Sequence, residues 1–213
     1  ERTTAGANFR YSPLAWLRVT GQLSYDRSNI SNQEFVPKGV PTAPFEEDPT
    51  DGSLGLEHDA IDSKNGSLMI TGNRMFGRFN PRLTVGGTFE SFDRLYFNAD
   101  VSNFAVKGLR DLDVAIDRDD MDSTVQEEAA NGILAHLALD YAGKYIGSFV
   151  ARRDGSSRYG SANRWHTYYA ARVAYRMAEE PWWPLAGVVT EFKPRGAFGT
   201  SGGPPEYDQQ YET

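Results

Sequence analysis

The chain has 213 residues, of which 39% are hydrophobic and 13% aromatic, and 21 of them are glycine. Abundant glycine and tyrosine with few aliphatic residues favour an all-β protein with many turns over a helical bundle. The net charge of −7 argues against general nucleic-acid binding, and the lack of cysteine excludes disulfides, thiol catalysis and cysteine-based zinc sites within these residues.

No run of about 18 apolar residues occurs, so the sequence predicts no transmembrane helix. A membrane β-barrel stays open, because its strands are short and only alternately apolar. The chain starts at Glu1 without an initiator methionine or signal peptide, so we expect a processed chain or a fragment of a longer protein.

The first elements are strands. A short strand is predicted over 4–13, and a longer one over 14–26 alternates strictly between two faces. Its apolar face carries Leu17, Val19, Leu23 and Tyr25, and its polar face carries Arg18, Thr20, Gln22 and Ser24. Residues 27–63 show no periodic alternation of apolar and polar residues and contain four prolines, which predicts a long loop.

The middle of the chain repeats this order. Residues 66–77 and 82–93 predict a hairpin, and in its second strand Leu83, Val85 and Phe89 lie opposite Arg82, Thr84, Thr88 and Glu90. Residues 94–130, which include the acidic run DRDDMD at 117–122, predict a second long loop.

The last part of the chain predicts four strands, over 132–141, 144–153, 166–177 and 188–199. The connection between the first two has only two or three residues, which requires antiparallel pairing. A medium connection at 154–165 follows, and then a short one at 178–187.

Short and long connections therefore alternate along the chain. In an up-and-down meander, this places tight turns at one end and large loops at the other, as in outer-membrane barrels. The strands have about the 9–11 residues that span a bilayer. Aromatic residues gather near the strand ends as in an interfacial girdle: Trp16, Tyr25, Phe76, Phe92, Tyr141, Tyr145, Trp165, Tyr168, Trp182 and Trp183.

The predicted fold class is all-β. We expect an antiparallel up-and-down meander of about eight strands, part of or derived from an outer-membrane β-barrel. Residues 1–213 would form a single β-barrel-like segment, with long loops at about 27–63 and 94–130. A soluble β-sandwich, whose strands also alternate, is the competing interpretation.

One motif narrows this class. Within 141–181, a DGSS turn between arginines precedes an N-R-W element. Its residues are Arg153, Asp154, Gly155, Ser156, Ser157, Arg158, Asn163, Arg164 and Trp165. The stretch resembles a signature region of the SusC/RagA-like TonB-dependent transporters, in which an R-x-DGSS-R turn precedes an N-R-W element. The stretches at 192–205 and 11–39 are similar to two further elements of that family.

The chain also departs from the family pattern. Pro194 stands where the family usually has an apolar strand residue, so we expect this strand to be bulged or at a sheet edge. A TonB box and a plug domain are missing from these residues, and a transporter barrel needs about 22 strands.

Each candidate site also has a structural interpretation. The Arg-Asp-Gly-Ser-Ser turn could contact a substrate or partner lipoprotein, but a turn held by its own side chains is the favoured interpretation. The run at 117–122 could hold calcium, but it lacks the EF-hand glycine and glutamate, so a solvated acidic loop is favoured. His58, His136 and His166 show no metal spacing. The sequence thus predicts no catalytic, metal or cofactor site and no enzyme activity.

The resemblance implies a barrel segment of a SusC-like transporter in the bacterial outer membrane, which imports glycans or peptides with a surface lipoprotein. Membrane lipid and that lipoprotein are the expected partners, and nucleic acid is not. Because they lie opposite the apolar faces, the candidate lumen-facing residues are Arg18, Thr20, Gln22, Arg82, Thr84 and Glu90.

A second function class remains open. If 213 residues were the whole mature protein, the chain would be a transporter-derived β-sheet protein, reused as an accessory subunit of a larger complex at the periplasmic face of a membrane. Its open sheet edges would then need protein partners to cover them. A gene product several times longer would favour the transporter, and a native mass near 23.7 kDa with co-purifying proteins would favour the subunit.

Overall fold

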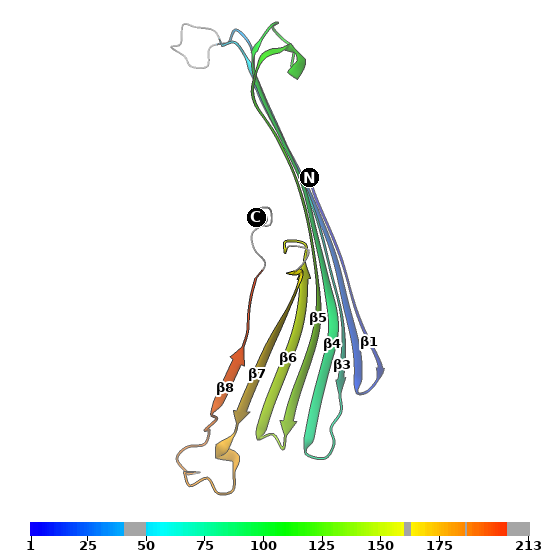
Figure 1. Cartoon of the computed structure of the whole chain (residues 1–213), viewed down its shortest axis with the longest axis vertical. Helices are drawn as coiled ribbons and strands as arrows, with labels where there is room; N and C mark the ends of the chain where they lie inside the picture. The colour runs from blue at the N-terminus through cyan, green and yellow to red at the C-terminus, as the bar shows by residue number, and fades with distance from the viewer. Residues whose placement is uncertain (41–49, 160–162, 186, 204–213) are drawn as a thin grey trace. The chain divides into compact units, whose positions relative to one another are not determined.

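The computed structural model describes residues 1–40, 50–159, 163–185 and 187–203. Its eight strands form one antiparallel sheet in which each strand pairs with its neighbour in sequence (Figure 1). The strands are β1 Arg2–Leu14, β2 Leu17–Val36, β3 Ser53–Asn73, β4 Phe79–Phe104, β5 Ala115–Tyr141, β6 Tyr145–Ser156, β7 Trp165–Tyr175 and β8 Arg195–Gly199. The predicted all-β meander of about eight strands is therefore confirmed.

Two short 3-10 turns have described bounds, η1 at Leu112–Val114 and η3 at Met177–Glu179. None of the described helices is long and apolar enough to cross a membrane.

The predicted long loops at 27–63 and 94–130 are wrong in extent. Strand β2 continues to Val36 and β3 begins at Ser53, while β4 runs to Phe104 and β5 begins at Ala115. The acidic run 117–122 lies inside β5. Polar side chains occupy both faces of β5 there, which hides the period of two, although the main-chain ladder is that of a strand. Residues 41–49 of the first predicted loop lie outside the described residues.

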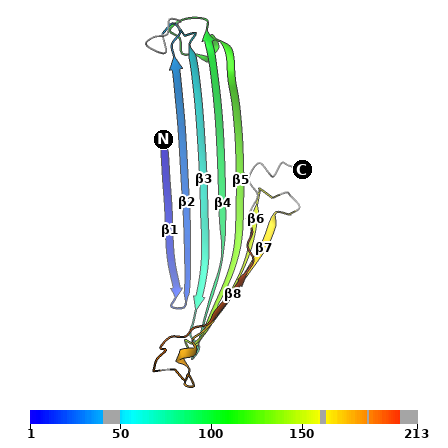
Figure 2. The ribbon, with the colours of Figure 1, turned by 90° about the vertical axis from the view of Figure 1, so that its left-hand side faces the viewer.

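The end of the chain differs in a similar way. Strand β8 covers only Arg195–Gly199 of the strand predicted over 188–199, and the connection from β7 spans 176–194. Strand β8 starts directly after Pro194 and is the last strand of the sheet within these residues. Strand β1 is the first (Figure 2).

The contacts between Cα atoms divide the chain into two compact units. Unit 1 consists of 1–5, 25–63 and 91–127, and unit 2 consists of 6–24, 64–90 and 128–213. Whether 1–213 act as a single segment stays a prediction.

Unit 1 has a small core of its own. Leu54, Val101 and Phe104 are each at most 2% exposed, and the ring of Phe104 stacks on that of Phe35 with centroids 5.9 Å apart. These residues come from the ends of β2, β3 and β4, so the core holds these strand ends together.

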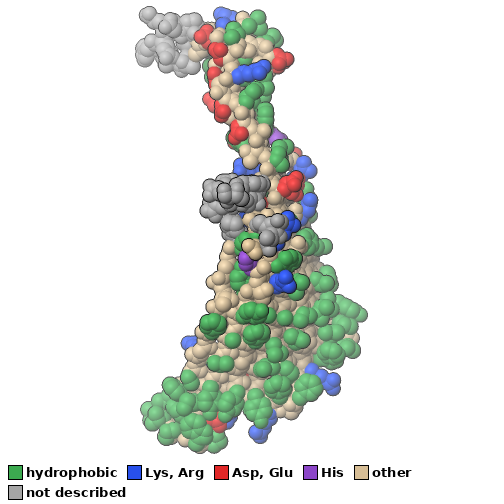
Figure 3. All heavy atoms as spheres, in the orientation of Figure 1, with side chains coloured by type: hydrophobic (Ala, Val, Ile, Leu, Met, Phe, Trp, Pro, Cys, Tyr) green, Lys and Arg blue, Asp and Glu red, His purple; other side chains and the backbone are tan. Residues whose placement is uncertain are grey.

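Among the described residues of unit 2, many large apolar side chains are exposed. Ile133, Phe149, Tyr169, Val173 and Phe198 are between 48% and 73% exposed. Figure 3 shows hydrophobic side chains gathered over the strands of this unit and over the β7–β8 connection.

Candidate functional site

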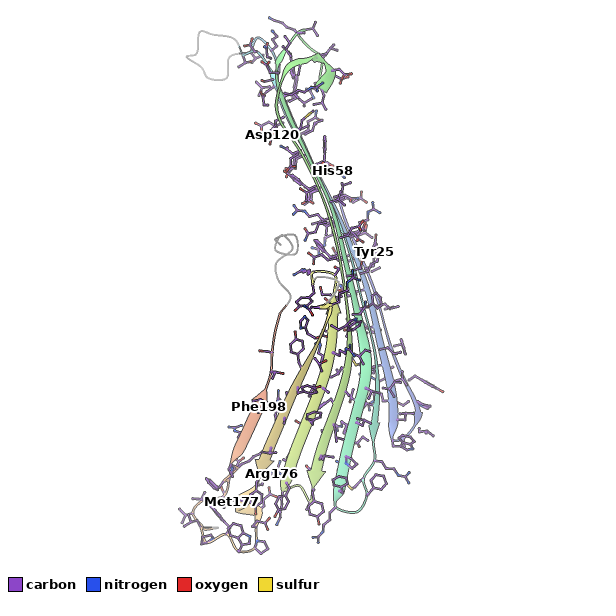
Figure 4. The ribbon with its side chains drawn as sticks, in the orientation of Figure 1. Tyr25, His58, Asp120, Arg176, Met177 and Phe198 are labelled. Atoms are coloured by element: carbon purple, nitrogen blue, oxygen red, sulfur yellow. The ribbon has the colours of Figure 1, made fainter. Side chains whose placement is uncertain are left out.

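The register of β5 to β8 separates two chemically different faces. Directly paired residues point to the same side of a sheet. One row runs Leu137, Phe149, Ala171 and Phe198, and the next runs Leu139, Gly147, Val173 and Gly196. We call this side the apolar face. Phe198 on β8 is labelled in Figure 4.

The opposite side of the same strands, here called the polar face, carries most of their charged and polar groups. His136, Arg152, Asp154, His166, Tyr168 and Arg172 lie on it by register. Arg152 Nε donates a hydrogen bond to Asp154 Oδ1 at 2.7 Å, and both side chains are partly exposed to solvent. A sheet with one apolar and one polar face is suited to separate lipid from water.

The turn after β6 is held by hydrogen bonds within the turn and to strand β5. Ser157 N–H donates to Ala129 O at 2.8 Å, and Ser157 Oγ accepts from Ala129 N–H at 2.9 Å. Ser156 Oγ accepts from Arg158 N–H at 3.2 Å, and Arg164 O accepts from Ser156 N–H at 3.2 Å. Neighbouring backbone therefore satisfies the two serines, as expected of a structural turn.

The motif arginines contact neighbouring strands. Arg158 Nε donates to Glu128 Oε2 at 2.6 Å, and the Glu128 side chain is only 9% exposed. The Arg153 guanidinium lies 5.5 Å from the centroid of the Trp165 ring. Trp165 in turn covers Gly155, where an added Cβ would lie 2.9 Å from the indole. The structure thus brings these motif residues together, while Asn163 lies in the connection that leads to Trp165.

Next to this turn lies an aromatic pair that the sequence does not indicate. The rings of Tyr159 and His166 have centroids 4.2 Å apart, and His166 Nε2 is a buried atom without a hydrogen-bond partner among the described residues. Burial raises the pKa of the Tyr159 hydroxyl, and its hydrogen bond with Tyr168 adds to this shift.

The six candidate lumen-facing residues lie on β2 and β4. Thr84 hydrogen-bonds through its hydroxyl to Thr71 on β3 at 3.0 Å, so these two share a face. By alternation, Arg82 and Glu90 lie on the side of Thr84, and Arg18, Thr20 and Gln22 share one side of β2. That these residues line a lumen stays a prediction.

At the tight-turn end of β5–β7, a tyrosine row marks the margin of the apolar face. The rings of Tyr145 and Tyr175 stack with centroids 4.7 Å apart, and Tyr141 lies 6.2 Å from Tyr145. Glu180 in the β7–β8 connection accepts hydrogen bonds from Lys144 Nζ and Tyr145 Oη, each at 3.0 Å. The lysine beside it holds the pKa of the Glu180 carboxyl below its ordinary value.

Charge is unevenly divided between the two units. Unit 1 contains 19 acidic and 7 basic residues, whereas unit 2 contains 10 acidic and 15 basic residues. In unit 1, Arg94 makes a bidentate ion pair with Asp59, with both N–O distances 2.9 Å, and this pair lowers the pKa of Asp59.

The acidic run of β5 forms no metal cage. Asp117 accepts a hydrogen bond from Asn103, and Asp120 accepts one from Asn98. In the described part of the chain, no three acidic or histidine side chains converge to hold a metal ion. His58 and Asp120, labelled in Figure 4, come from β3 and β5.

Sequence reasoning misses the unit 1 core and Glu128. A signal for the core is present, because Leu95, Phe97, Ala99 and Val101 alternate with polar residues inside the stretch predicted as a loop. Nothing in the sequence marks Glu128 among its acidic neighbours, because only the pairing of β5 with β6 brings it to Arg158.

Comparisons with known proteins agree with the geometry. The chain is 27% identical over 137 residues to TonB-dependent receptor P3 of Formosa agariphila, covering 63% of this chain and 14% of the receptor. It is 30% identical over 74 residues to TonB-dependent receptor P39 of the same organism, covering 35% of this chain and 7% of the receptor. No protein-family model matches.

Solved structures resemble the fold. The RagAB peptide importer in its open-open state matches with a TM-score of 0.79 and 15% identity, over 93% of this chain and 22% of that one. Its closed-closed state matches with a TM-score of 0.77. The predicted resemblance to part of a SusC/RagA-like transporter is thereby confirmed, and the chain spans less than a quarter of each of these relatives.

Proposed function

We propose that the chain is a barrel segment of a TonB-dependent outer-membrane transporter, with its apolar face toward lipid and its polar face toward the lumen. The observation that carries this proposal is the register of β5–β8, which places Leu137, Phe149 and Phe198 on one side and Arg152, His166 and Arg172 on the other. Exposed apolar side chains in such a continuous band are costly in water and favourable in lipid.

The strand lengths support the same proposal. Strands β4 and β5 have 26 and 27 residues, whereas about 9–11 residues cross a bilayer. The remaining residues of these strands belong to the acidic unit 1 and would not be needed to cross the bilayer.

The transported substrate would be a glycan or a peptide. The resemblance leaves both classes open, and the solved neighbours are named as peptide transporters. By the same resemblance, a surface lipoprotein would be the partner, and the segment would contribute lumen-lining side chains and loops without catalysis.

Uptake measurements test this proposal. Cells of the source bacterium with and without the gene are given fluorescent oligosaccharides or oligopeptides, with and without a protonophore. We expect uptake of one class to need both the gene and the proton-motive force. Equal uptake in both strains for both classes would contradict the proposal.

The accessory-subunit alternative differs from the transporter in what pairs with the first and last strands. Strands β1 and β8 end the sheet, and an uncovered edge invites pairing. In a transporter these edges pair with further barrel strands, whereas in an accessory subunit they pair with other proteins. Native mass measurement of the detergent-extracted protein separates the two, because only the subunit would have a chain mass near 23.7 kDa with partner proteins bound.

A further inference from the structure

The connection between β7 and β8 is unusual for the end of the sheet where it lies. The β1–β2 turn at that end has two residues and the β5–β6 turn has three, whereas this connection spans 176–194. It begins after Tyr175 with Arg176 and Met177, both labelled in Figure 4. It is also rich in apolar side chains, including two adjacent tryptophans.

Part of the connection packs on itself. Trp183 Nε1 donates to Val189 O at 3.1 Å, and the Trp183 ring stacks on Phe192 with centroids 5.2 Å apart. These contacts give the connection a local fold instead of leaving it an open loop.

Several apolar side chains of the connection are nevertheless exposed. Trp182 is 58% exposed, Leu185 48%, Val188 85% and Phe192 44%. A water-facing turn of this size would be expected to carry polar residues, and apolar side chains gathered with tryptophan are typical of a membrane interface.

This exposed surface is joined to the apolar face. Glu180 is hydrogen-bonded to Tyr145 of the tyrosine row, and Tyr145 stacks on Tyr175. A mainly apolar pocket of 640 Å³ lies beside the same row, and Leu139, Gly147, Val173 and Gly196 are among the residues that line it. The two glycines leave space between larger neighbours, as a lipid chain would require.

We propose that the β7–β8 connection lies in the phospholipid head-group layer, with Trp182, Leu185 and Val188 inserted at the boundary with the acyl chains. This inference rests on the proposed function, because it requires the adjoining apolar face to contact lipid. A phospholipid interface is favoured over a protein partner because the connection continues an apolar band and ends on a row of tyrosines, which prefer that depth.

Single cysteines test the inference, because residues 1–213 contain no cysteine of their own. Three matched variants of the full-length protein, Val173→Cys, Val188→Cys and Val40→Cys, receive a bimane label in phosphatidylcholine vesicles that contain nitroxide-labelled lipid. Val40, 47% exposed in unit 1, is the control for an apolar position in water. Leu185→Cys provides a second position in the connection.

We expect lipid nitroxide to reduce the fluorescence at positions 173, 188 and 185 but not at 40. A nitroxide at the head-group end of the acyl chain should quench position 188 more than one near the chain terminus. Quenching at 173 but not at 188 or 185 would overturn this inference and leave the proposed function standing. Absence of quenching at 173 as well would overturn both.

Aqueous iodide provides the second readout. A label at position 188 that neither lipid nitroxide nor iodide quenches would be covered by protein, and this result would also overturn the inference.

Discussion

Glycines beside large residues set close contacts between neighbouring strands. The ring of Phe9 covers Gly21, that of Phe89 covers Gly66, and that of Trp165 covers Gly155. In each case the ring occupies the space that a Cβ would fill. Aromatic cover over a strand glycine buries backbone that would otherwise be exposed, which fixes the register of the pair.

Two adjacent glycines of β4 should respond differently to the same substitution. A Cβ on Gly86 would collide with the main-chain oxygen of Leu68, whereas a Cβ on Gly87 would lie 3.4 Å from Gly132 O, an ordinary contact. Because backbone cannot rotate away, we expect Gly86→Ala to lower the free energy of unfolding by about 1–3 kcal/mol. Gly87→Ala should change it by less than about 0.5 kcal/mol.

Urea unfolding in detergent, followed by tryptophan fluorescence, measures both values. Equal midpoints for the two variants would contradict the close approach of β3 to β4 at Gly86.

The pair between Arg158 and Glu128 should be the most sensitive contact of the signature turn. Arg158→Ala would leave the carboxylate of Glu128, which is 9% exposed, with less compensation, and we expect a loss of about 1–3 kcal/mol. Arg2→Ala breaks the pair with Asp26, in which Arg2 is 70% exposed, and should cost less, because exposed ion pairs contribute little to stability. Unfolding midpoints of the two variants provide the measurement, and a larger loss for Arg2→Ala would contradict this ranking.

At the scale of elements, β2–β5 are longer than the roughly 9–11 residues that cross a bilayer. The additional residues of these strands share the small core of unit 1. Phe104 is 1% exposed and stacks on Phe35, and Arg110 lies 4.7 Å from the Phe35 ring centroid. The core therefore supports the connection 105–114 as well as the strand ends.

Removal of the Phe104 ring should lower the stability of unit 1. Phe104→Ala creates a cavity in a small core, and we expect a local loss of about 3–5 kcal/mol. Limited proteolysis should then cut within 105–114, whereas Val106→Ala, at a 46% exposed position, should leave the wild-type pattern. An unchanged pattern for Phe104→Ala would show that the core does not hold the connection.

The ion pair between β3 and β4 should make unit 1 sensitive to acid. Arg94 lowers the pKa of Asp59 from its ordinary value of 3.8, so the pair contributes stability above that value and loses it as pH falls through the lowered pKa. A bimane label at Val40→Cys reports unfolding of unit 1 in urea. We expect the midpoint to fall as pH decreases below 3.8 and Asp59→Asn to weaken this dependence. An identical pH profile in both proteins would contradict the role of Asp59.

At the scale of the whole molecule, the sequence predicts the meander well where strands alternate. Leu17, Val19 and Leu23 on β2, and Ile133, Leu137 and Leu139 on β5, repeat every second residue because one side of the strand is apolar. That period is absent from 117–122, because acidic residues lie on both sides of the strand there. Periodicity therefore predicts a strand that begins at 132, whereas β5 begins at Ala115. Pairing between strands is a property of two segments at once, and single-segment periodicity cannot predict it.

The candidate site is predictable to the same extent. The residues of the signature turn locate it in the sequence, and the hydrogen bond from Arg158 N–H to Ser156 Oγ is ordinary turn chemistry. The role of Glu128, the contact of Tyr159 with His166 and the local fold of the β7–β8 connection all depend on contacts between residues that are not adjacent in sequence.

The division of the sheet into a lipid-facing and a water-facing side is the central claim, and labelling along β6 tests it most directly. Single cysteines at residues 146–151 are labelled in nitroxide-containing vesicles, one variant at a time. The account predicts strong quenching at Gly147, Phe149 and Ala151 and weak quenching at Ile146, Ser148 and Val150, because the register places these sets on opposite faces. Uniform quenching, or quenching that is stronger at the second set, would contradict it.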